Sequence, residues 1–176
     1  SCQAFADLIT IDEYKETARP KVVLTWAPHP KALPQAVPNS FAEWMNAADV
    51  DFVITHPKGY ELDPAFAGNA RVEYDQMKAF EGADFIYAKN WSCPGVTCPE
   101  SYGKILDDYH QMMHWTVDEA HMAVTDNARF MHCLPVRRGM IVSDGVIEAP
   151  TSLVIPEAAN REISATVVIK RMLESL

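Results

Sequence analysis

The stretch KVVLTW, residues 21–26, decides how the chain is interpreted. It is short and mostly apolar, which is typical of a strand buried on both faces of a parallel sheet. DFVITH (51–56) and DFIYA (84–88) have the same character. RFMH (129–132) and SLVIP (152–156) complete the strands that the sequence predicts. Buried strands of this kind indicate a sheet that is enclosed between helices.

Helical patterns separate these strands. They are predicted over residues 2–17, 35–48, 63–68, 74–83, 102–115, 116–125 and 157–176, the last as an amphipathic helix. Short strands that alternate with helices predict an α/β fold, a three-layer Rossmann-like domain with a mostly parallel sheet. The length of 176 residues suits one domain, and the sequence contains no internal repeat or linker.

Composition and charge argue against several classes of protein. The net charge of −9 disfavours a general nucleic-acid binder, and no apolar run approaches the roughly 20 residues that a membrane span needs. Four cysteines without an export signal predict reduced thiols in the cytoplasm. Because the sequence opens directly on a helical pattern, without an initiating methionine, we expect a fragment of a longer protein.

Three segments follow the ends of predicted strands: Trp26–His29, Ala88–Trp91 and His132–Arg138. In an open parallel sheet, ligands bind beyond the carboxyl ends of the strands, so these segments are candidate site loops. The sequence has no glycine-rich GxGxxG turn, which argues against a dinucleotide cofactor.

The third segment, HCLPVRRG (132–139), carries the most chemistry. Arg137 and Arg138 can form paired hydrogen bonds with a carboxylate or a phosphate. Cys133 is a candidate nucleophile, but His132, its neighbour on a strand, would point to the opposite face and could not activate it. Cys133 is therefore interpreted as a binding group. The alternative is a strand end followed by two solvated arginines.

A second constellation is close to a zinc site. Cys93 and Cys98 precede His110 and His114 at nearly the spacing of a two-Cys, two-His motif, and the two histidines would share one helix face. The acidic residues beside His110 do not fit the basic helix of a DNA-reading finger. A zinc-stabilised binding module stays open as an alternative to a plain loop followed by polar helix residues.

HCLPVRRG is similar to the HCLP signature of the ornithine transcarbamylase family, and its two arginines resemble the branch that acts on N-acylated ornithine. Four further segments fit in order along nearly the whole chain. They are CQAFADLITIDEYK, similar to the end of the family's H-P-x-Q motif and its helix; TWAPHPKALPQAVPNSF, similar to a second-domain loop; DFIYAKNW, at the amino-acid-binding loop; and PEAANREISATVVIKRML, similar to the terminal E-x-x-N-R helix.

The resemblance implies a fold, a reaction and partners. Family members have two α/β domains, and this chain (residues 1–176) resembles the second, amino-acid-binding one, without the amino-terminal domain that carries the main carbamoyl-phosphate loop. The reaction moves the carbamoyl group of carbamoyl phosphate to the side-chain amine of N-acylornithine (N-succinyl- or N-acetylornithine) in arginine biosynthesis. The family works as a homotrimer and needs no metal or organic cofactor. The chain alone would be inactive.

The resemblance also implies roles for single residues around carbamoyl phosphate. Gln3 matches the glutamine that hydrogen-bonds the carbamoyl group. Cys133 and Leu134 match residues that surround the carbamoyl nitrogen and the attacking amine. Arg161 matches the arginine that helps to hold carbamoyl phosphate. The bond between Leu134 and Pro135 is cis in relatives, which would aim the Leu134 carbonyl oxygen.

Four other residues match contacts to the acylornithine: His29, Leu33, Lys89 and Arg137. Lys89 and Arg137 suit its α-carboxylate. Without the resemblance, Lys89 would be interpreted as a strand-end lysine with its charge in water, and His29 as an ordinary loop histidine.

One position bears on the acyl group. Ile141 stands four residues after Arg137, where some N-acetylornithine enzymes carry a lysine. An apolar residue there resembles the subgroup that uses N-succinylornithine. An ordinary ornithine carbamoyltransferase domain is the remaining alternative within the family, and the pair Arg137–Arg138 argues against it.

Overall fold

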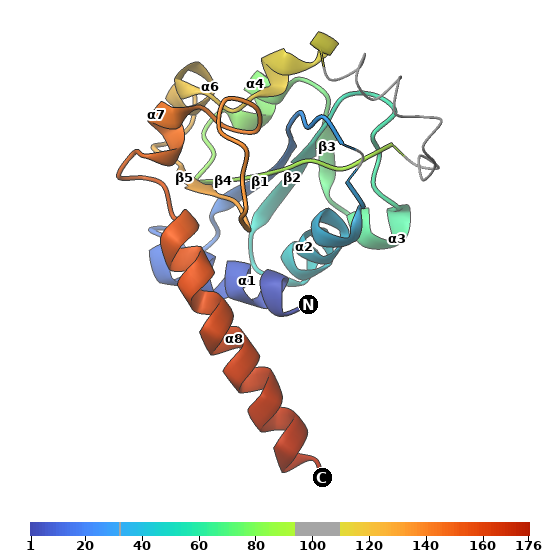
Figure 1. Ribbon diagram of the computed structural model, residues 1–176, viewed down its shortest axis with the longest axis vertical. Helices are drawn as coiled ribbons and strands as arrows, with labels where there is room; N and C mark the ends of the chain where they lie inside the picture. Colours follow the sequence, from blue (N-terminus) through green and yellow to red (C-terminus); the bar gives the residue numbers. More distant parts are fainter. Residues whose placement is uncertain (32, 94–109) are drawn as a thin grey trace.

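The computed structural model describes residues 1–31, 33–93 and 110–176. Its centre is a parallel sheet of five strands in the order β3-β2-β1-β4-β5 (Figure 1). The strands are β1 (Lys21–Trp26), β2 (Asp51–Thr55), β3 (Arg71–Glu73), β4 (Phe85–Lys89) and β5 (Arg129–Met131). The described helices are α1 (Cys2–Tyr14), α2 (Ala36–Ala47), α3 (Pro64–Ala67), α4 (Gln76–Phe80), α6 (Glu119–Ala123), α7 (Asp144–Ile147), α8 (Val154–Glu174) and the 3-10 helix η2 (Met113–Trp115). The expected α/β fold is confirmed.

Helices cover both faces of the sheet. Successive side chains of a strand point to opposite faces, so Val22 and Leu24 of β1 pack in one core with α1 and α2. Val23, between them, packs in a second core with residues of α4 and α7. Because β1 is buried on both faces, its sequence is an almost continuous apolar run. The result is the three-layer arrangement that the sequence predicts.

The strand predicted at residues 152–156 is wrong. Ser152 makes one isolated bridge to Phe130, and Val154–Pro156 form the first turn of α8. A short apolar run does not distinguish a buried strand from the buried start of a helix. Proline is tolerated in that first turn because its amide would have no partner within the helix.

Other differences concern short elements. The sequence patterns do not predict β3 or α7, which have 3 and 4 residues and are too short to show a period. The helix predicted over 102–115 falls mainly outside the described residues, and its last residues form η2. The loop predicted at residues 90–102 also lies largely outside them.

The first half of α8 packs against α1 (Figure 1). Its buried residues Glu157, Asn160 and Ser164 are spaced three and four apart, so they form one stripe of the helix. The Ser164 hydroxyl donates to the Cys2 carbonyl oxygen (2.9 Å), and the Asn160 amide donates to the Thr10 hydroxyl (3.0 Å). These bonds fix the start of the chain beside the start of its last helix.

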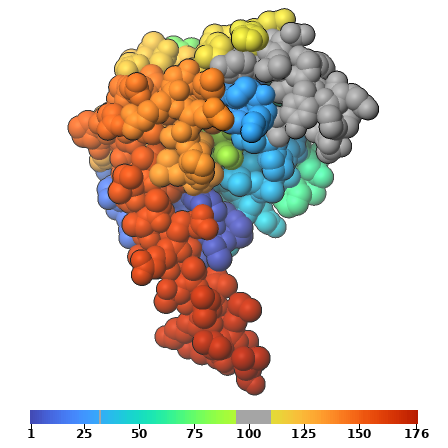
Figure 2. Space-filling view, in the orientation of Figure 1, coloured from blue at the N-terminus to red at the C-terminus, as the bar shows by residue number. Residues whose placement is uncertain are grey.

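The second half of α8 extends beyond the rest of the molecule (Figures 1 and 2). It exposes the apolar side chains of Val167, Val168, Ile169, Met172 and Leu173. Across the described ranges, no helix has both the length and the apolar character that crossing a membrane requires.

Candidate functional site

The order of the sheet reverses between β1 and β4. The chain adds β2 and β3 on one side of β1, while β4 and β5 lie on the other side. Such a reversal leaves a crevice beyond the carboxyl ends of the strands, where ligands bind. Trp26 and Lys89, the last residues of β1 and β4, pair across this boundary. The candidate loops after β1, β4 and β5 therefore leave the sheet at one edge.

Hydrogen bonds join the loop after β1 to the loop after β4. The Asn90 side-chain amide donates to the Ala27 carbonyl oxygen (2.7 Å), in a buried position. Ser92 donates to the Leu33 carbonyl oxygen from both its amide and its hydroxyl, each at 2.9 Å. Leu33, a predicted substrate contact, is thereby held against the β4 loop.

Two buried tryptophans connect the segments at this edge of the sheet. The indole N–H of Trp26 donates to the Trp91 carbonyl oxygen (2.8 Å), and that of Trp91 donates to the Tyr60 carbonyl oxygen (2.7 Å). Both indoles are buried, at 3% and 0% exposure. Their role is structural, because their polar atoms are used within the protein.

His29 and Arg137 meet although 108 residues separate them. Arg137 Nε donates to His29 Nε2 at 3.2 Å. Since arginine can only donate, this bond requires His29 Nε2 to accept. His29 Nδ1 faces the backbone of Lys31 and lies 3.2 Å from its carbonyl oxygen and 3.0 Å from its amide nitrogen. Burial lowers the pKa of His29, and the charges of Arg137 and Lys89 lower it further. We call His29, Leu33, Lys89 and Arg137 the rim.

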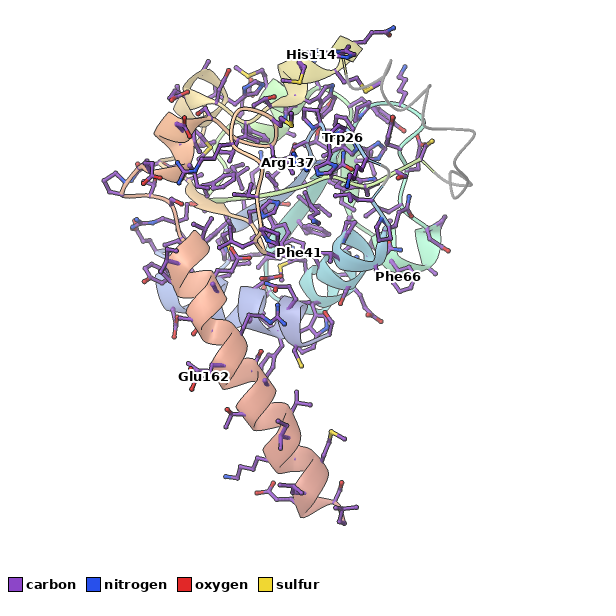
Figure 3. The ribbon with its side chains drawn as sticks, viewed as in Figure 1. Trp26, Phe41, Phe66, His114, Arg137 and Glu162 are labelled. Atoms are coloured by element: carbon purple, nitrogen blue, oxygen red, sulfur yellow. The ribbon has the colours of Figure 1, made fainter. Side chains whose placement is uncertain are left out.

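The two arginines of HCLPVRRG have different partners. Arg138 donates to the Asp144 carboxylate (3.1 Å) and also pairs with the Glu148 carboxylate. Arg137 has no carboxylate partner among the described residues, and its exposed guanidinium lies on the loop after β5 (Figure 3). A ligand carboxylate can therefore pair with Arg137 without displacing an existing ion pair.

His132 is buried and neutral at the end of β5. Burial, together with the nearby Lys89 and His29, lowers its pKa to about 3. Its Nδ1 accepts from the Leu134 amide (3.0 Å), which places the proton on Nε2. This Nε2 is buried and has no hydrogen-bond partner within the described part of the chain. His132 therefore bonds to the backbone and does not activate the neighbouring thiol.

Cys133 carries a neutral thiol. Burial raises its pKa, although the ammonium group of Lys89 acts in the opposite direction. A thiol with a raised pKa is a poor nucleophile. Cys133 packs against the core on the α1 and α2 side of the sheet. These properties support a binding role for Cys133 and argue against a nucleophilic one.

The backbone turns sharply at Leu134. Its φ is 45°, in the left-handed region that residues with a side chain rarely adopt. The bond from Leu134 to Pro135 is cis, as expected from the sequence. The Leu134 side chain packs against the core on the α4 side. Strained backbone of this kind is concentrated at functional sites.

Gln3 and Arg161 form a pair at the junction of α1 and α8. The Arg161 guanidinium donates to the Gln3 side-chain oxygen at 2.6 Å. The Gln3 amide nitrogen donates to Asp7 at 2.6 Å and lies 3.4 Å from Glu157. The structure thus brings together two predicted carbamoyl-phosphate contacts that are 158 residues apart.

Beneath this pair lies a cluster that sequence reasoning missed. Asp7, Tyr87 and Glu157 are all 0% exposed, and Glu157 accepts from the His132 amide at 2.8 Å. We call these residues and His132 the buried network; Gln3 and Arg161 cap it at the surface. A signal was available, because Asp7 lies among buried apolar residues of α1, where a carboxyl group needs a partner.

The zinc hypothesis is not tested by the structure. Cys98 lies outside the described residues. Among the residues that are described, no group of three or more His, Cys, Asp or Glu side chains could hold a metal ion. The site of Cys93, Cys98, His110 and His114 stays a prediction, which elemental analysis of the purified protein would test.

Known proteins match this chain over most of its length. The family model described as the Asp/Orn-binding domain of aspartate/ornithine carbamoyltransferase matches residues 34–172. N-succinylornithine carbamoyltransferase of Bacteroides fragilis (strain 638R) is 74% identical over 174 residues, which are 99% of this chain and 53% of that protein. N-acetylornithine carbamoyltransferase of Xylella fastidiosa (strain 9a5c) is 36% identical over 175 residues, 91% of this chain and 52% of that protein.

A solved structure matches the fold. It is a mutant of N-acetyl-L-ornithine transcarbamylase complexed with carbamyl phosphate and N-succinyl-L-norvaline. The TM-score is 0.85 at 32% identity, over 96% of this chain and 55% of that one. This chain therefore spans about half the length of the relatives it matches.

Proposed function

This chain belongs to the aspartate/ornithine carbamoyltransferase family, and we propose that it is the acylornithine-binding domain of an N-succinylornithine carbamoyltransferase. One observation carries the choice of substrate. Identity is 74% to a relative named for N-succinylornithine and 36% to one named for N-acetylornithine. Ile141 supports the same choice, because it is buried in the apolar core, where some N-acetylornithine enzymes carry a lysine.

The complete enzyme joins this chain to an amino-terminal domain that carries the main carbamoyl-phosphate loop. The match to about half of each relative supports this arrangement. We propose a homotrimer in the cytoplasm that uses no metal or organic cofactor, with carbamoyl phosphate and N-succinylornithine as substrates in arginine biosynthesis.

In the reaction, the side-chain amine of the acylornithine attacks the carbamoyl carbon. A new C–N bond forms, the C–O bond to phosphate breaks, and the amine loses a proton; the products are the acylcitrulline and phosphate. Positioning and charge neutralisation are what such a transfer needs. Arg161 neutralises charge on carbamoyl phosphate, and Gln3 orients the carbamoyl group.

The rim holds the other substrate. Lys89 and Arg137 attract the α-carboxylate of the acylornithine. His29 orients the Arg137 guanidinium through their 3.2 Å bond, and Leu33 supplies an apolar contact. Cys133 and Leu134 surround the carbamoyl nitrogen and the attacking amine. Because the Cys133 thiol is neutral, its state favours direct transfer to the amine without a covalent enzyme intermediate.

A carbamoylation assay of the complete enzyme tests this function. It compares ornithine, N-acetylornithine and N-succinylornithine at equal concentrations, with citrulline derivatives and phosphate as the measured products. We expect the highest kcat/KM with N-succinylornithine and no turnover by this chain alone. Turnover of ornithine alone would contradict the proposal and favour an ordinary ornithine carbamoyltransferase.

A further inference from the structure

Two buried carboxyl groups lie next to one another where α1 meets α8. Asp7 and Glu157 are 150 residues apart in sequence, and each has 0% of its surface exposed. The Gln3 amide nitrogen lies within hydrogen-bond distance of both side chains, 2.6 Å from Asp7 and 3.4 Å from Glu157. The second oxygen of Asp7 is buried and has no hydrogen-bond partner among the described residues. A buried carboxylate needs hydrogen bonds or an opposite charge, so two of them side by side require an explanation.

The contacts of the pair form a continuous chain of polar groups. Arg161 donates to Gln3, and Gln3 donates to Asp7, both at 2.6 Å. At the other end, Glu157 accepts from the backbone amide of His132 at 2.8 Å. The pair therefore joins α1, α8 and the loop after β5, which are the three segments that carry Gln3, Arg161 and Cys133.

The pair can ionise only once without a large cost. Burial raises the pKa of Asp7 to about 6, although the side chains of Gln3 and Glu157 act in the opposite direction; burial and the neighbouring Asp7 together raise the pKa of Glu157 well above its ordinary value.

The one cation facing the pair, among the described residues, is the Arg161 guanidinium. Two further titratable groups face the pair, the buried hydroxyl of Tyr87 and the thiol of Cys133. The Tyr87 hydroxyl has no well-aligned hydrogen bond within the described part of the chain.

We propose that Asp7 and Glu157 share a single proton and act as positioning residues, which hold Gln3, Arg161 and the His132 backbone in the arrangement that receives carbamoyl phosphate. The proton lies on Glu157, facing Asp7, because the other Glu157 oxygen accepts from the His132 amide. This inference rests on the proposed function. Loss of the shared proton at high pH would place two negative charges together and separate α1 from α8.

The kinetic test compares two substitutions of Glu157 in the complete enzyme. Glu157→Gln can donate to Asp7 and accept from the His132 amide, but it cannot ionise. We expect its KM for carbamoyl phosphate to stay within about threefold of wild type near neutral pH, and the alkaline fall of kcat/KM to disappear. Glu157→Leu removes both bonds, so that KM should rise roughly 10-fold or more, with little change in the KM for the acylornithine.

A matched control is available on the same helix. Glu162→Gln makes the same chemical change at an exposed position that points away from the body of the protein (Figure 3). It should leave both KM values and the pH profile unchanged. The positioning role is contradicted if Glu157→Gln keeps the wild-type alkaline limb, or if Glu157→Leu raises both KM values equally.

A second measurement does not depend on activity or on the folding of Glu157→Leu. Infrared difference spectroscopy distinguishes the C=O stretch of a protonated carboxylic acid from that of a carboxylate. Wild-type enzyme near neutral pH should show one buried protonated carboxyl group, which Glu157→Gln lacks and Glu162→Gln retains. If wild type shows none, the shared proton is refuted. If the band is present but the enzyme turns over no ornithine derivative, the proposed function fails and the shared proton stands.

Discussion

The rim and the buried network lie at the same edge of the sheet but are held in different ways. The rim residues come from the loop after β1, the end of β4 and the loop after β5, and none of them is fully buried. In the network, Asp7 and Glu157 have no exposed surface and connect the first helix to the last. A rim side chain can therefore be replaced with loss of one contact, whereas a change in the network alters several elements at once.

Two histidines show this difference most clearly. Burial lowers the pKa of both His29 and His132, but His132 is much more deeply buried and its pKa falls to about 3. An unfolded histidine binds a proton below about pH 6.5, so His132 favours folding above that value and loses its contribution as the pH falls from 6.5 toward 3. The loss is about 2 kcal/mol between pH 6.5 and roughly 5, and it grows to about 3.5 kcal/mol near pH 3.5.

The largest predicted effect is therefore on acid stability. Unfolding free energies of wild type and His132→Asn, measured by denaturant titration across this pH range, should converge as the pH falls. The quantity to compare is the difference in unfolding free energy between wild type and His132→Asn at each pH. The absolute curve of wild type is less informative, because Asp7 has a raised pKa and its contribution to stability is lost as the pH rises through about 6. His29→Asn is the control and should change the curve less, since its ring is partly exposed. Parallel curves for wild type and His132→Asn would contradict a neutral, buried His132.

The next effect concerns the surface end of the network. Arg161→Ala should lower kcat/KM for carbamoyl phosphate by roughly 100-fold, because a hydrogen bond from a charged group is worth up to about 3 kcal/mol. Arg171→Ala, on the exposed last turn of the same helix, is the matched control and should stay close to wild type. The measurement is the initial rate of the complete enzyme at varied carbamoyl phosphate. If the two substitutions lower kcat/KM equally, Arg161 does not contact carbamoyl phosphate.

The rim was predictable from the sequence for a local reason. Lys89 ends a recognisable apolar strand, and His29 and Arg137 lie on loops that follow two others, so strand ends alone mark them as candidates. The resemblance to a family then identified Arg137, and not Arg138, as the predicted substrate contact. The ion pairs of Arg138 with Asp144 and Glu148 agree with that prediction.

The network was not predictable in the same way. Spacing within α1 brings Gln3 and Asp7 together, but their contact with Glu157 depends on how two distant helices pack. The sequence predicts a strand at 152–156 and a helix from Glu157, so it places Glu157 at the amino-terminal end of the helix and does not show the turn of α8 that precedes it. Contacts between polar groups on distant elements produce no pattern in the sequence, whereas buried strands are recognisable as short apolar runs.

A smaller effect is expected for a rim residue, and the neighbouring residues Arg137 and Arg138 provide a test and its control. Arg137→Ala should raise the KM for the acylornithine by roughly 10-fold or more, as expected for loss of one charge-assisted bond to its carboxylate. Arg138→Ala should change that KM by less than about twofold, because it removes only exposed ion pairs. Steady-state kinetics with varied acylornithine compare the two, and an unchanged KM for Arg137→Ala would count against its assigned role.

The smallest effect is expected where the rim is held by backbone. Ser92→Ala removes the hydroxyl that donates to the Leu33 carbonyl oxygen but leaves the Ser92 amide bond to the same atom. Because one donor remains, the loss should be about 1 kcal/mol, and the KM for the acylornithine should rise only a few-fold. Ser175→Ala, whose hydroxyl bonds only within the end of α8, is the control. A 100-fold effect of Ser92→Ala would mean that the hydroxyl contacts substrate, and that the rim extends onto the β4 loop beyond Lys89.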